Sequence, residues 1–197
     1  MGKRGFDLIA SACALLVLSP LLLLIAAAVA IESPGGAFFR QVRVGKGGKE
    51  FRLLKFRTMR LGSEAGGQIT VGGRDPRITR IGYVLRKTKL DELPQLLNIV
   101  VGEMSVVGPR PEVPRYVALY SEEQRQVLSV RPGLTSLASI AYIDENEVLG
   151  RASDPERVYV DEVMPAKLAL DLRYVREHSM RLDLRIIART ALRLFNR

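Results

Sequence analysis

An unbroken apolar segment near the N-terminus dominates the pattern of hydrophobic and polar positions. From Leu8 to Ile31 the chain has 24 residues without a formal charge, most of them Leu, Ala, Val or Ile. A helix rises about 1.5 Å per residue, so this segment is long enough to cross a hydrocarbon core about 30 Å thick. The pattern predicts a membrane helix. The apolar segment is longer than the apolar core of most cleaved signal peptides, which argues against that alternative.

Basic residues flank this segment on both sides, and they favour a re-entrant helix. Lys3 and Arg4 precede it, and the 18 residues that follow it carry four more basic residues. Because basic flanks prefer the cytoplasmic side, a helix that crosses the membrane once would leave one basic flank on the opposite, unfavourable side. Pro20 removes a helical donor near the middle, and Ser19 can bond a freed carbonyl. From the residues alone, two interpretations of residues 1–32 stay open: a re-entrant helix that enters and leaves one face, and a kinked helix that spans the membrane.

The polar part of the chain contains strand-like and loop-like patterns. Residues 37–58 hold two stretches rich in strand-forming residues, separated by a turn with three glycines, which predicts a β-hairpin. Residues 62–73 carry five glycines and are predicted to form a mobile loop.

The C-terminal segment predicts an amphipathic helix with an arginine at every fourth position from Arg181 to Arg197. Like charges at this spacing oppose each other by about 0.2–0.5 kcal/mol per pair. Anionic lipid would offset this repulsion, since each basic residue near such a surface contributes about 1 kcal/mol. The alternative is a helix docked on the core with a solvated basic face. The apolar face consists of Leu184, Ile187, Ala188, Ala191, Leu192 and Phe195.

Composition adds a strongly basic balance and excludes several classes of protein. The chain has 197 residues, a formal net charge of +9 and 47% hydrophobic residues, which is typical of one ordered domain. With one cysteine, Cys13, and one histidine, His178, it can form neither an internal disulfide nor a Cys/His zinc site. It has no Trp and 6% aromatic residues, so we expect no nucleic-acid partner.

The clearest candidate chemistry is the acidic pair Asp91 and Glu92. Pro94 fits the first turn of a helix, so the pair is predicted near a helix N-terminus, where acidic residues also occur as ordinary caps. Its surroundings favour a functional role, because basic residues precede it in 86–89 and Arg110 follows between two prolines. Carboxylates among cations suit a phosphate group and a divalent cation together. The chain has no Walker A motif and no nucleophile elbow.

These residues belong to an ordered set of motifs that resembles the bacterial sugar transferases, the small monotopic phosphoglycosyl transferases, over nearly the whole chain. One stretch departs from the family pattern, because Ser136-Leu137-Ala138-Ser139 stands where the family often has Gly-Trp-Ala-Gln. No sugar-specificity role is therefore carried over from that Trp or Gln. The matching stretches are Lys3–Asp7, Ser19–Pro20, Phe51–Met59, Leu90–Leu96, Met104–Glu112 and Arg131–Thr135.

The resemblance implies a mostly α fold with a small β-hairpin, an α+β class, and amphipathic helices at the membrane interface. Residues 1–32 would form a re-entrant membrane helix broken at Ser19 and Pro20. Residues 33–197 would form a catalytic domain that ends in the amphipathic helix. The protein would be monotopic, on the cytoplasmic face of the bacterial inner membrane, in contact with anionic lipid.

The implied reaction moves a sugar-1-phosphate from a UDP-sugar to polyprenyl (undecaprenyl) phosphate and releases UMP. By motif position, Asp91 is the nucleophile and a Mg²⁺ ligand, and Glu92 is its catalytic partner. Arg86 and Arg110 are the candidates for binding substrate phosphate. Because a carboxylate nucleophile divides one displacement into two, we expect a ping-pong cycle through a phosphosugar adduct on Asp91.

A second hypothesis is a non-enzymatic basic membrane adaptor that recruits acidic partners. It shares the membrane helix and the positive charge but requires neither a nucleophile nor a metal ion. The sequence leaves open which sugar is transferred, which glycan pathway the protein serves and whether it forms a homo-oligomer.

Overall fold

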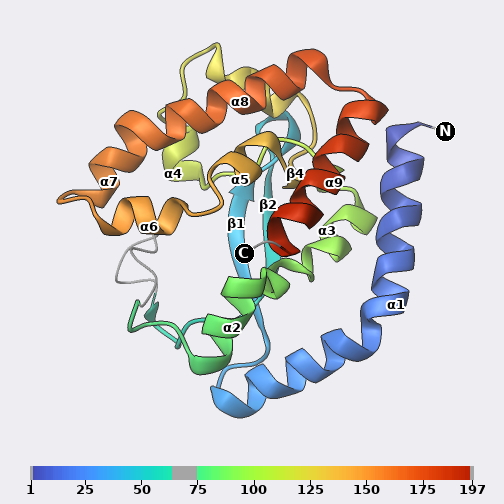
Figure 1. Ribbon diagram of the computed structural model, residues 1–197, viewed down its shortest axis with the longest axis vertical. Coiled ribbons are helices and arrows are strands. Elements are labelled where there is room, and N and C mark those ends of the chain that lie inside the picture. The colour runs from blue at the N-terminus through green and yellow to red at the C-terminus, as the bar shows by residue number, and fades with distance from the viewer. Residues whose placement is uncertain (1, 64–74, 196–197) are drawn as a thin grey trace.

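The computed structural model describes residues 2–63 and 75–195, apart from the side chain of Phe195. Within these residues the fold is mostly helical with two small sheets, so the expected α+β class is confirmed (Figure 1). The predicted glycine-rich loop 62–73 lies largely outside the described residues.

The helices are α1 Lys3–Glu32, α2 Arg80–Thr88, α3 Gln95–Val101, α4 Pro114–Val117, α5 Leu137–Ala141, α6 Glu145–Gly150, α7 Pro155–Val158, α8 Met164–Glu177 and α9 Met180–Phe195. The strands are β1 Phe38–Val44, β2 Glu50–Phe56, β3 Ser105–Val107 and β4 Gly133–Thr135.

The predicted hairpin is confirmed by β1 and β2, which pair antiparallel with Phe38 opposite Phe56 and Val44 opposite Glu50. Leu53 and Phe56 of β2 enter buried clusters and anchor the hairpin to the helices. A second, parallel pair of strands joins β3 to β4, and the sequence pattern did not predict it. Each of these strands has three residues, too few for an alternating pattern to stand out.

The apolar segment forms the long helix α1, which is the one helix among the described residues that is long and apolar enough to cross a membrane. Its backbone stays helical through Pro20, and the Ser19 hydroxyl donates to the carbonyl of Leu16 at 2.8 Å. Figure 1 shows that α1 bends sharply about midway along its length. Proline inside a helix is a common cause of such a bend.

Both ends of α1 are tied to the same domain. Near its start, Asp7 accepts hydrogen bonds from the Ser105 hydroxyl at 2.9 Å and the Val106 amide at 3.1 Å. At its other end, the Glu32 carboxylate accepts from the first amides of α2, with 2.8 Å to the amide of Arg80. The residues near the start of α1 and those at its end are therefore both bonded to the domain formed by the rest of the chain.

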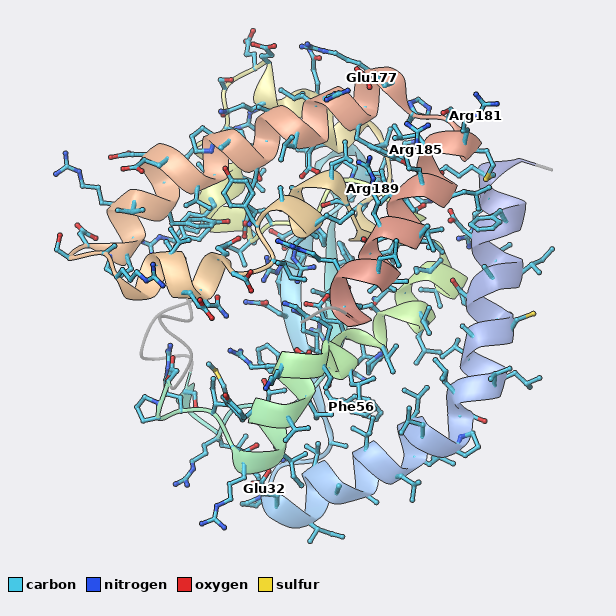
Figure 2. All side chains as sticks on the ribbon, in the orientation of Figure 1. Glu32, Phe56, Glu177, Arg181, Arg185 and Arg189 are labelled. Atoms are coloured by element: carbon cyan, nitrogen blue, oxygen red, sulfur yellow. The ribbon has the colours of Figure 1, made fainter. Side chains whose placement is uncertain are left out.

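Helix α9 is present as predicted, but its most apolar face is not the docked one. Asp183 and Ile186 are buried, and the Asp183 carboxylate binds Tyr174 at 2.7 Å and Lys3 at 2.6 Å. Leu184, Ala188 and Leu192 of the predicted apolar face are exposed, whereas Ile187 packs against the buried cluster of Val107, Tyr174 and Ile186. Helix α9 is therefore docked on the core with its arginines exposed, which fits the core-docked alternative, and its contact with lipid stays a prediction. Figure 2 shows Arg181, Arg185 and Arg189 following one another along α9.

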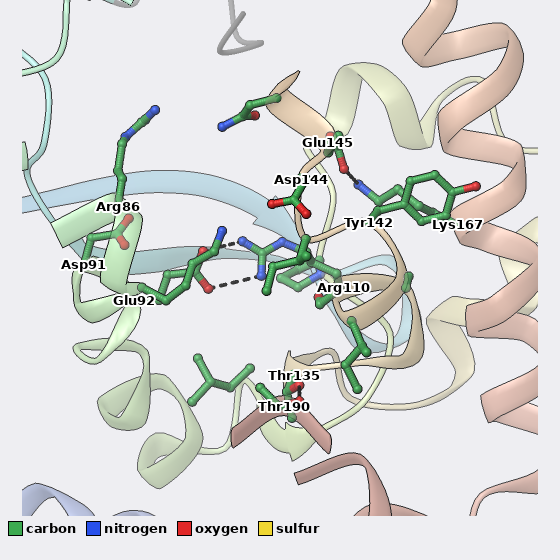
Figure 3. A pocket seen from close by; sticks show the side chains of 18 of the residues that line it. Arg86, Asp91, Glu92, Arg110, Thr135, Tyr142, Asp144, Glu145, Lys167 and Thr190 are labelled. Carbon is green, nitrogen blue, oxygen red and sulfur yellow. Dashed lines mark hydrogen bonds and ion pairs between the residues drawn. The ribbon is translucent and has the colours of Figure 1, made fainter. Parts of the chain in front are cut away.

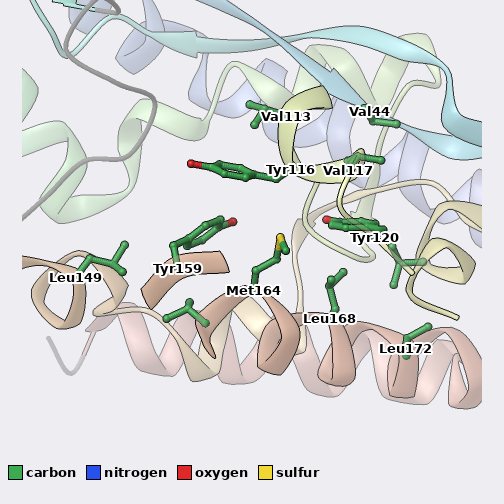
Figure 4. Close-up of a cluster of buried hydrophobic side chains, with 12 residues drawn as sticks. Val44, Val113, Tyr116, Val117, Tyr120, Leu149, Tyr159, Met164, Leu168 and Leu172 are labelled. Atoms are coloured by element: carbon green, nitrogen blue, oxygen red, sulfur yellow. The ribbon is translucent and has the colours of Figure 1, made fainter. Parts of the chain in front are cut away.

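The largest buried cluster lies between α8, α4 and the end of β1 (Figure 4). Tyr116 and Tyr159 meet there with ring centroids 4.9 Å apart, and Met164 and Leu168 of α8 pack beside them. This cluster holds α8 in place, and α8 in turn forms one wall of the cavity described below.

We expect Asp7→Ala to loosen the attachment of α1. The substitution removes the acceptor of the half-buried Val106 amide and one of the two acceptors of the buried Ser105 hydroxyl, and an unsatisfied buried polar group costs about 1–3 kcal/mol. The midpoint of thermal unfolding in lipid nanodiscs should fall, whereas Glu122→Ala, at an exposed site, should leave it unchanged. Equal midpoints for the two variants would contradict this role of Asp7.

Candidate active site

Asp91 and Glu92 lie in a tight turn, Leu90–Glu92, that joins α2 to α3. Lys89 precedes the turn with a φ of 59°, a left-handed conformation that redirects the chain. The sequence analysis placed the pair at a helix N-terminus, where acidic side chains serve as caps. In the structure α3 begins at Gln95 and no side chain caps it, so both carboxylates precede the helix and are free for another role.

Glu92 is buried and held by two cations. Arg110 donates to both of its oxygens, at 3.1 and 2.5 Å, and the Lys55 ammonium lies 3.3 Å from one of them. Burial alone would raise the pKa of Glu92. The charges of Arg110 and Lys55 outweigh burial and hold that pKa well below its usual value. Glu92 is therefore ionised at neutral pH.

Asp91 has a different environment although it is the next residue. Its Oδ1 atom is buried and has no hydrogen-bond partner among the described residues. Burial raises the pKa of Asp91, the nearby charge of Lys55 opposes that rise, and the negative charge of Glu92 adds to it. Two adjacent carboxyl groups whose pKa values are pushed apart are typical of a catalytic pair with separate roles.

Both carboxylates line a cavity of about 970 Å³ that several distant segments build together. In Figure 3, Arg86 from α2 lies beside Asp91, and Arg110 meets Glu92 across the cavity. The Arg86 guanidinium donates to the Thr58 hydroxyl at 2.9 Å, which keeps it beside the acidic pair. The further cations that line the cavity are Arg43, Lys55, Lys87, Lys89, Lys167 and Arg193.

A further carboxylate, Glu112, holds together another wall of the cavity. The Arg43 guanidinium donates to it at 3.0 Å, and the Tyr159 hydroxyl donates to its other oxygen. Above this wall, Lys167 of α8 pairs with Glu145 at 2.6 Å and ties the start of α6 to α8. The cavity is thus enclosed by a network of ion pairs rather than by apolar packing alone.

Asp171 of α8 supports the segment that carries Arg110. Burial raises the pKa of Asp171 to about 7, and hydrogen bonds with the Arg110 backbone and the Ser136 side chain act against that rise. Ser136 also caps α5, because its hydroxyl accepts from the amide of Ser139 at 2.9 Å. The stretch that departs from the family pattern therefore has a structural role here, and two of its members, Ala138 and Ser139, line the cavity.

The structure brings Arg86, Asp91, Glu92 and Arg110 together, while Ser19 and Pro20 lie apart from them in α1, as expected. Sequence reasoning missed Lys55, Arg43 and Asp171 as parts of the site. Lys55 stands in a strand that is otherwise mostly apolar, and that break in pattern was the available signal. The contribution of Arg43 and Asp171 depends on contacts with residues far along the chain.

The donor set around Asp91 fits one divalent cation that is completed by substrate. No group of three or more His, Cys, Asp or Glu residues forms a full metal site within residues 2–63 and 75–195. Mg²⁺ commonly uses one or two carboxylates and takes its other oxygens from phosphate and water. Both oxygens of Glu92 accept hydrogen bonds from Arg110, whereas Oδ1 of Asp91 has no hydrogen-bond partner in the part of the chain that the structure describes.

Comparison with known proteins finds relatives named as sugar-phosphate transferases and as an exopolysaccharide production protein. The chain is 42% identical over 192 residues to a UDP-glucose:undecaprenyl-phosphate glucose-1-phosphate transferase of Caulobacter vibrioides, covering 95% of this chain and 67% of that protein. It is also 42% identical to the exopolysaccharide production protein PSS of Rhizobium leguminosarum bv. phaseoli, covering 94% of this chain and 90% of that protein. A UDP-N-acetylgalactosamine-undecaprenyl-phosphate N-acetylgalactosaminephosphotransferase of Aeromonas hydrophila is 37% identical, and the match covers 95% of this chain and 42% of that protein.

The family model described as bacterial sugar transferase matches residues 1–197, the full length of the chain. With the acidic pair, its cations and the apolar helix all in place, the chain belongs to the bacterial sugar transferase family.

Proposed function

We propose that this enzyme transfers a sugar-1-phosphate from a UDP-sugar to undecaprenyl phosphate and releases UMP. The observation that carries the proposal is the Asp91 Oδ1 atom, which has no hydrogen-bond partner within residues 2–63 and 75–195 and lies beside an ionised Glu92 in a cation-lined cavity. The names of the relatives describe this reaction with glucose and with N-acetylgalactosamine as the sugar. A membrane adaptor would explain the basic surface but gives no reason for a buried carboxyl pair.

In the first step Asp91 attacks the phosphorus that bears the sugar. A diphosphate repels a carboxylate, so Arg86 and the other cations of the cavity must first neutralise its oxygens. A bond forms between the Asp91 oxygen and phosphorus, and the bond from phosphorus to the UMP oxygen breaks. UMP leaves with that electron pair, and an acyl-phosphate that carries the sugar remains on Asp91.

In the second step a phosphate oxygen of undecaprenyl phosphate attacks the same phosphorus. The bond to Asp91 breaks, the carboxylate is restored, and the product is an undecaprenyl diphosphate sugar. Because the pKa of Glu92 is held low, Glu92 is a poor proton carrier at neutral pH. We assign it an orienting role: its two hydrogen bonds keep the Arg110 guanidinium directed into the cavity.

Asp91 is also the residue that would hold Mg²⁺. The bound ion supplies positive charge for the phosphate oxygens and so weakens their repulsion of the carboxylate. Arg86 and Arg110 supply fixed charge to the same oxygens from opposite sides of the acidic pair (Figure 3).

The two substrates meet at a membrane surface, and α1 supports a monotopic attachment. Both of its ends contact one domain, through Asp7 and Glu32, which favours a re-entrant helix over a spanning one. With basic flanks at both ends, the cytoplasmic face of a bacterial inner membrane is the expected location. The exposed apolar residues of α9 and its arginine series suit an anionic lipid surface.

We expect Asp91→Asn to abolish transfer, because an amide cannot act as the nucleophile. UMP release from a UDP-sugar with Mg²⁺ and undecaprenyl phosphate should fall by about a thousandfold or more. The wild-type protein incubated with donor alone should gain the mass of one sugar phosphate on Asp91. The exposed control Glu122→Gln should keep full activity. Unchanged turnover in Asp91→Asn, or product without an adduct, would rule out this mechanism.

Lys55→Gln tests the electrostatics of the pair. The charge of Lys55 lowers the pKa of both Asp91 and Glu92, so its removal raises both values. As pH falls, the ionised carboxylates are then lost earlier, and the acidic limb of kcat/KM for the UDP-sugar should move to higher pH. Lys49→Gln, at an exposed position in the hairpin turn, is the matched control. An acidic limb that stays in place would contradict the assignment.

Site-specific labelling tests the topology of α1. In a Cys13→Ala background, Gly2→Cys should react with a membrane-impermeant maleimide in inverted vesicles and remain protected in intact cells. Glu122→Cys, in the polar domain, should behave in the same way. A spanning helix would give the opposite result, with labelling at residue 2 in intact cells alone.

A further inference from the structure

The cavity has two ends that differ in chemistry, on either side of the Glu92–Arg110 pair. The end toward Asp144 is polar. On the other side of the pair in Figure 3, the hydroxyls of Thr135 and Thr190 meet at 2.5 Å and join β4 to α9. Apolar residues of β3, β4, α5 and α9 line the cavity around this junction: Val106, Leu134, Ile140, Ile187, Ala191 and Leu194.

The α9 residues Ile187, Ala191 and Leu194, which we call the α9 wall, lie on a helix that is also tied to the apolar helix α1. Lys3 of α1 pairs with Asp183 at the start of α9, and Figure 1 shows α9 beside the first half of α1. On the outer side of the same helix, Leu184 and Leu192 are 51% and 62% exposed. One helix therefore presents apolar side chains both to the cavity and to the surroundings of α1.

The apolar end of the cavity has no counterpart in a nucleotide sugar. The donor carries phosphates, hydroxyl groups and a uracil base, and the cations around Asp91 and Glu92 suit its diphosphate. The acceptor named for the relatives is a phosphate on a long hydrocarbon chain. Charge complementarity assigns its phosphate to the cation-lined centre, with Arg193 of α9 as a further cavity-lining cation, and its hydrocarbon to the apolar end.

We propose, on the basis of the function proposed above, that the α9 wall binds the first isoprenoid units of the polyprenyl phosphate acceptor. The acceptor then approaches from the lipid side of α9 with its phosphate directed at the phosphorus held on Asp91. The donor enters at the polar end toward Asp144. The two substrates thereby reach the same phosphorus from opposite sides of the Glu92–Arg110 pair.

A matched pair of leucines on α9 tests the proposal. Leu194 is 36% exposed and lines the cavity, whereas Leu192 is exposed and does not line it. In a ping-pong cycle, kcat/KM for each substrate reports only its own half-reaction. Leu194→Ala should lower kcat/KM for undecaprenyl phosphate by about tenfold or more, since the substitution removes three carbons of a partly exposed side chain and each buried carbon contributes about a fourfold factor. Its kcat/KM for the UDP-sugar should stay at the wild-type value.

Leu192→Ala should leave kcat/KM for both substrates close to wild type. Ala191→Gln, on the α9 wall, and Ala188→Gln, exposed and outside the cavity, form a second pair with the same expected contrast. All variants are compared in nanodiscs of one composition, with unfolding midpoints as the check on folding.

Equal losses in the two leucine variants would overturn the subsite, because they would reflect membrane contact alone. A loss in Leu194→Ala confined to the UDP-sugar would overturn it in favour of a donor site. A wild-type protein that forms no lipid-linked product would overturn the proposed function itself, whereas a fully active wild type with a silent Leu194→Ala would overturn only the acceptor site.

Discussion

The ion pair between Arg110 and Glu92 is the interaction on which the site depends. It joins the turn after α2 to the segment after β3, and both partners are largely removed from water. A buried ion pair is a weak source of stability because desolvation cancels much of the attraction, but breaking it leaves an uncompensated charge. Its effect here is on geometry and on charge: Glu92 stays ionised, and its negative charge helps to raise the pKa of its neighbour Asp91.

The site is assembled from short elements that contribute little on their own. Lys55 comes from β2, Arg86 from α2 and Arg110 from the loop after β3, and each is fixed by a contact outside its own element. Asp171 holds the Arg110 segment from α8, which the tyrosine-rich cluster of Figure 4 keeps in place. Preorganised charge of this kind needs no rearrangement when a diphosphate arrives.

The membrane helix is part of the same framework rather than a separate anchor. Asp7 binds β3, Lys3 binds α9, and Glu32 caps the start of α2, which carries Arg86. The long apolar helix α1 is therefore bonded directly to the elements that build the cavity. This arrangement suits a reaction in which one substrate is dissolved in water and the other in the bilayer.

The sequence by itself determined the long apolar helix with its proline, the hairpin, the amphipathic character of α9 and the acidic pair with Arg86 and Arg110. Hydropathy period, turn residues and ordered motifs are local properties, so they can be found without a partner. The tertiary structure alone decided that Lys55 meets Glu92, that Oδ1 of Asp91 has no hydrogen-bond partner among the described residues, and that Asp183 and Ile186 of α9 are buried while Leu184 and Leu192 stay exposed. Those features arise from contacts between residues far apart along the chain, and no spacing in the sequence specifies which distant partner a polar side chain will meet.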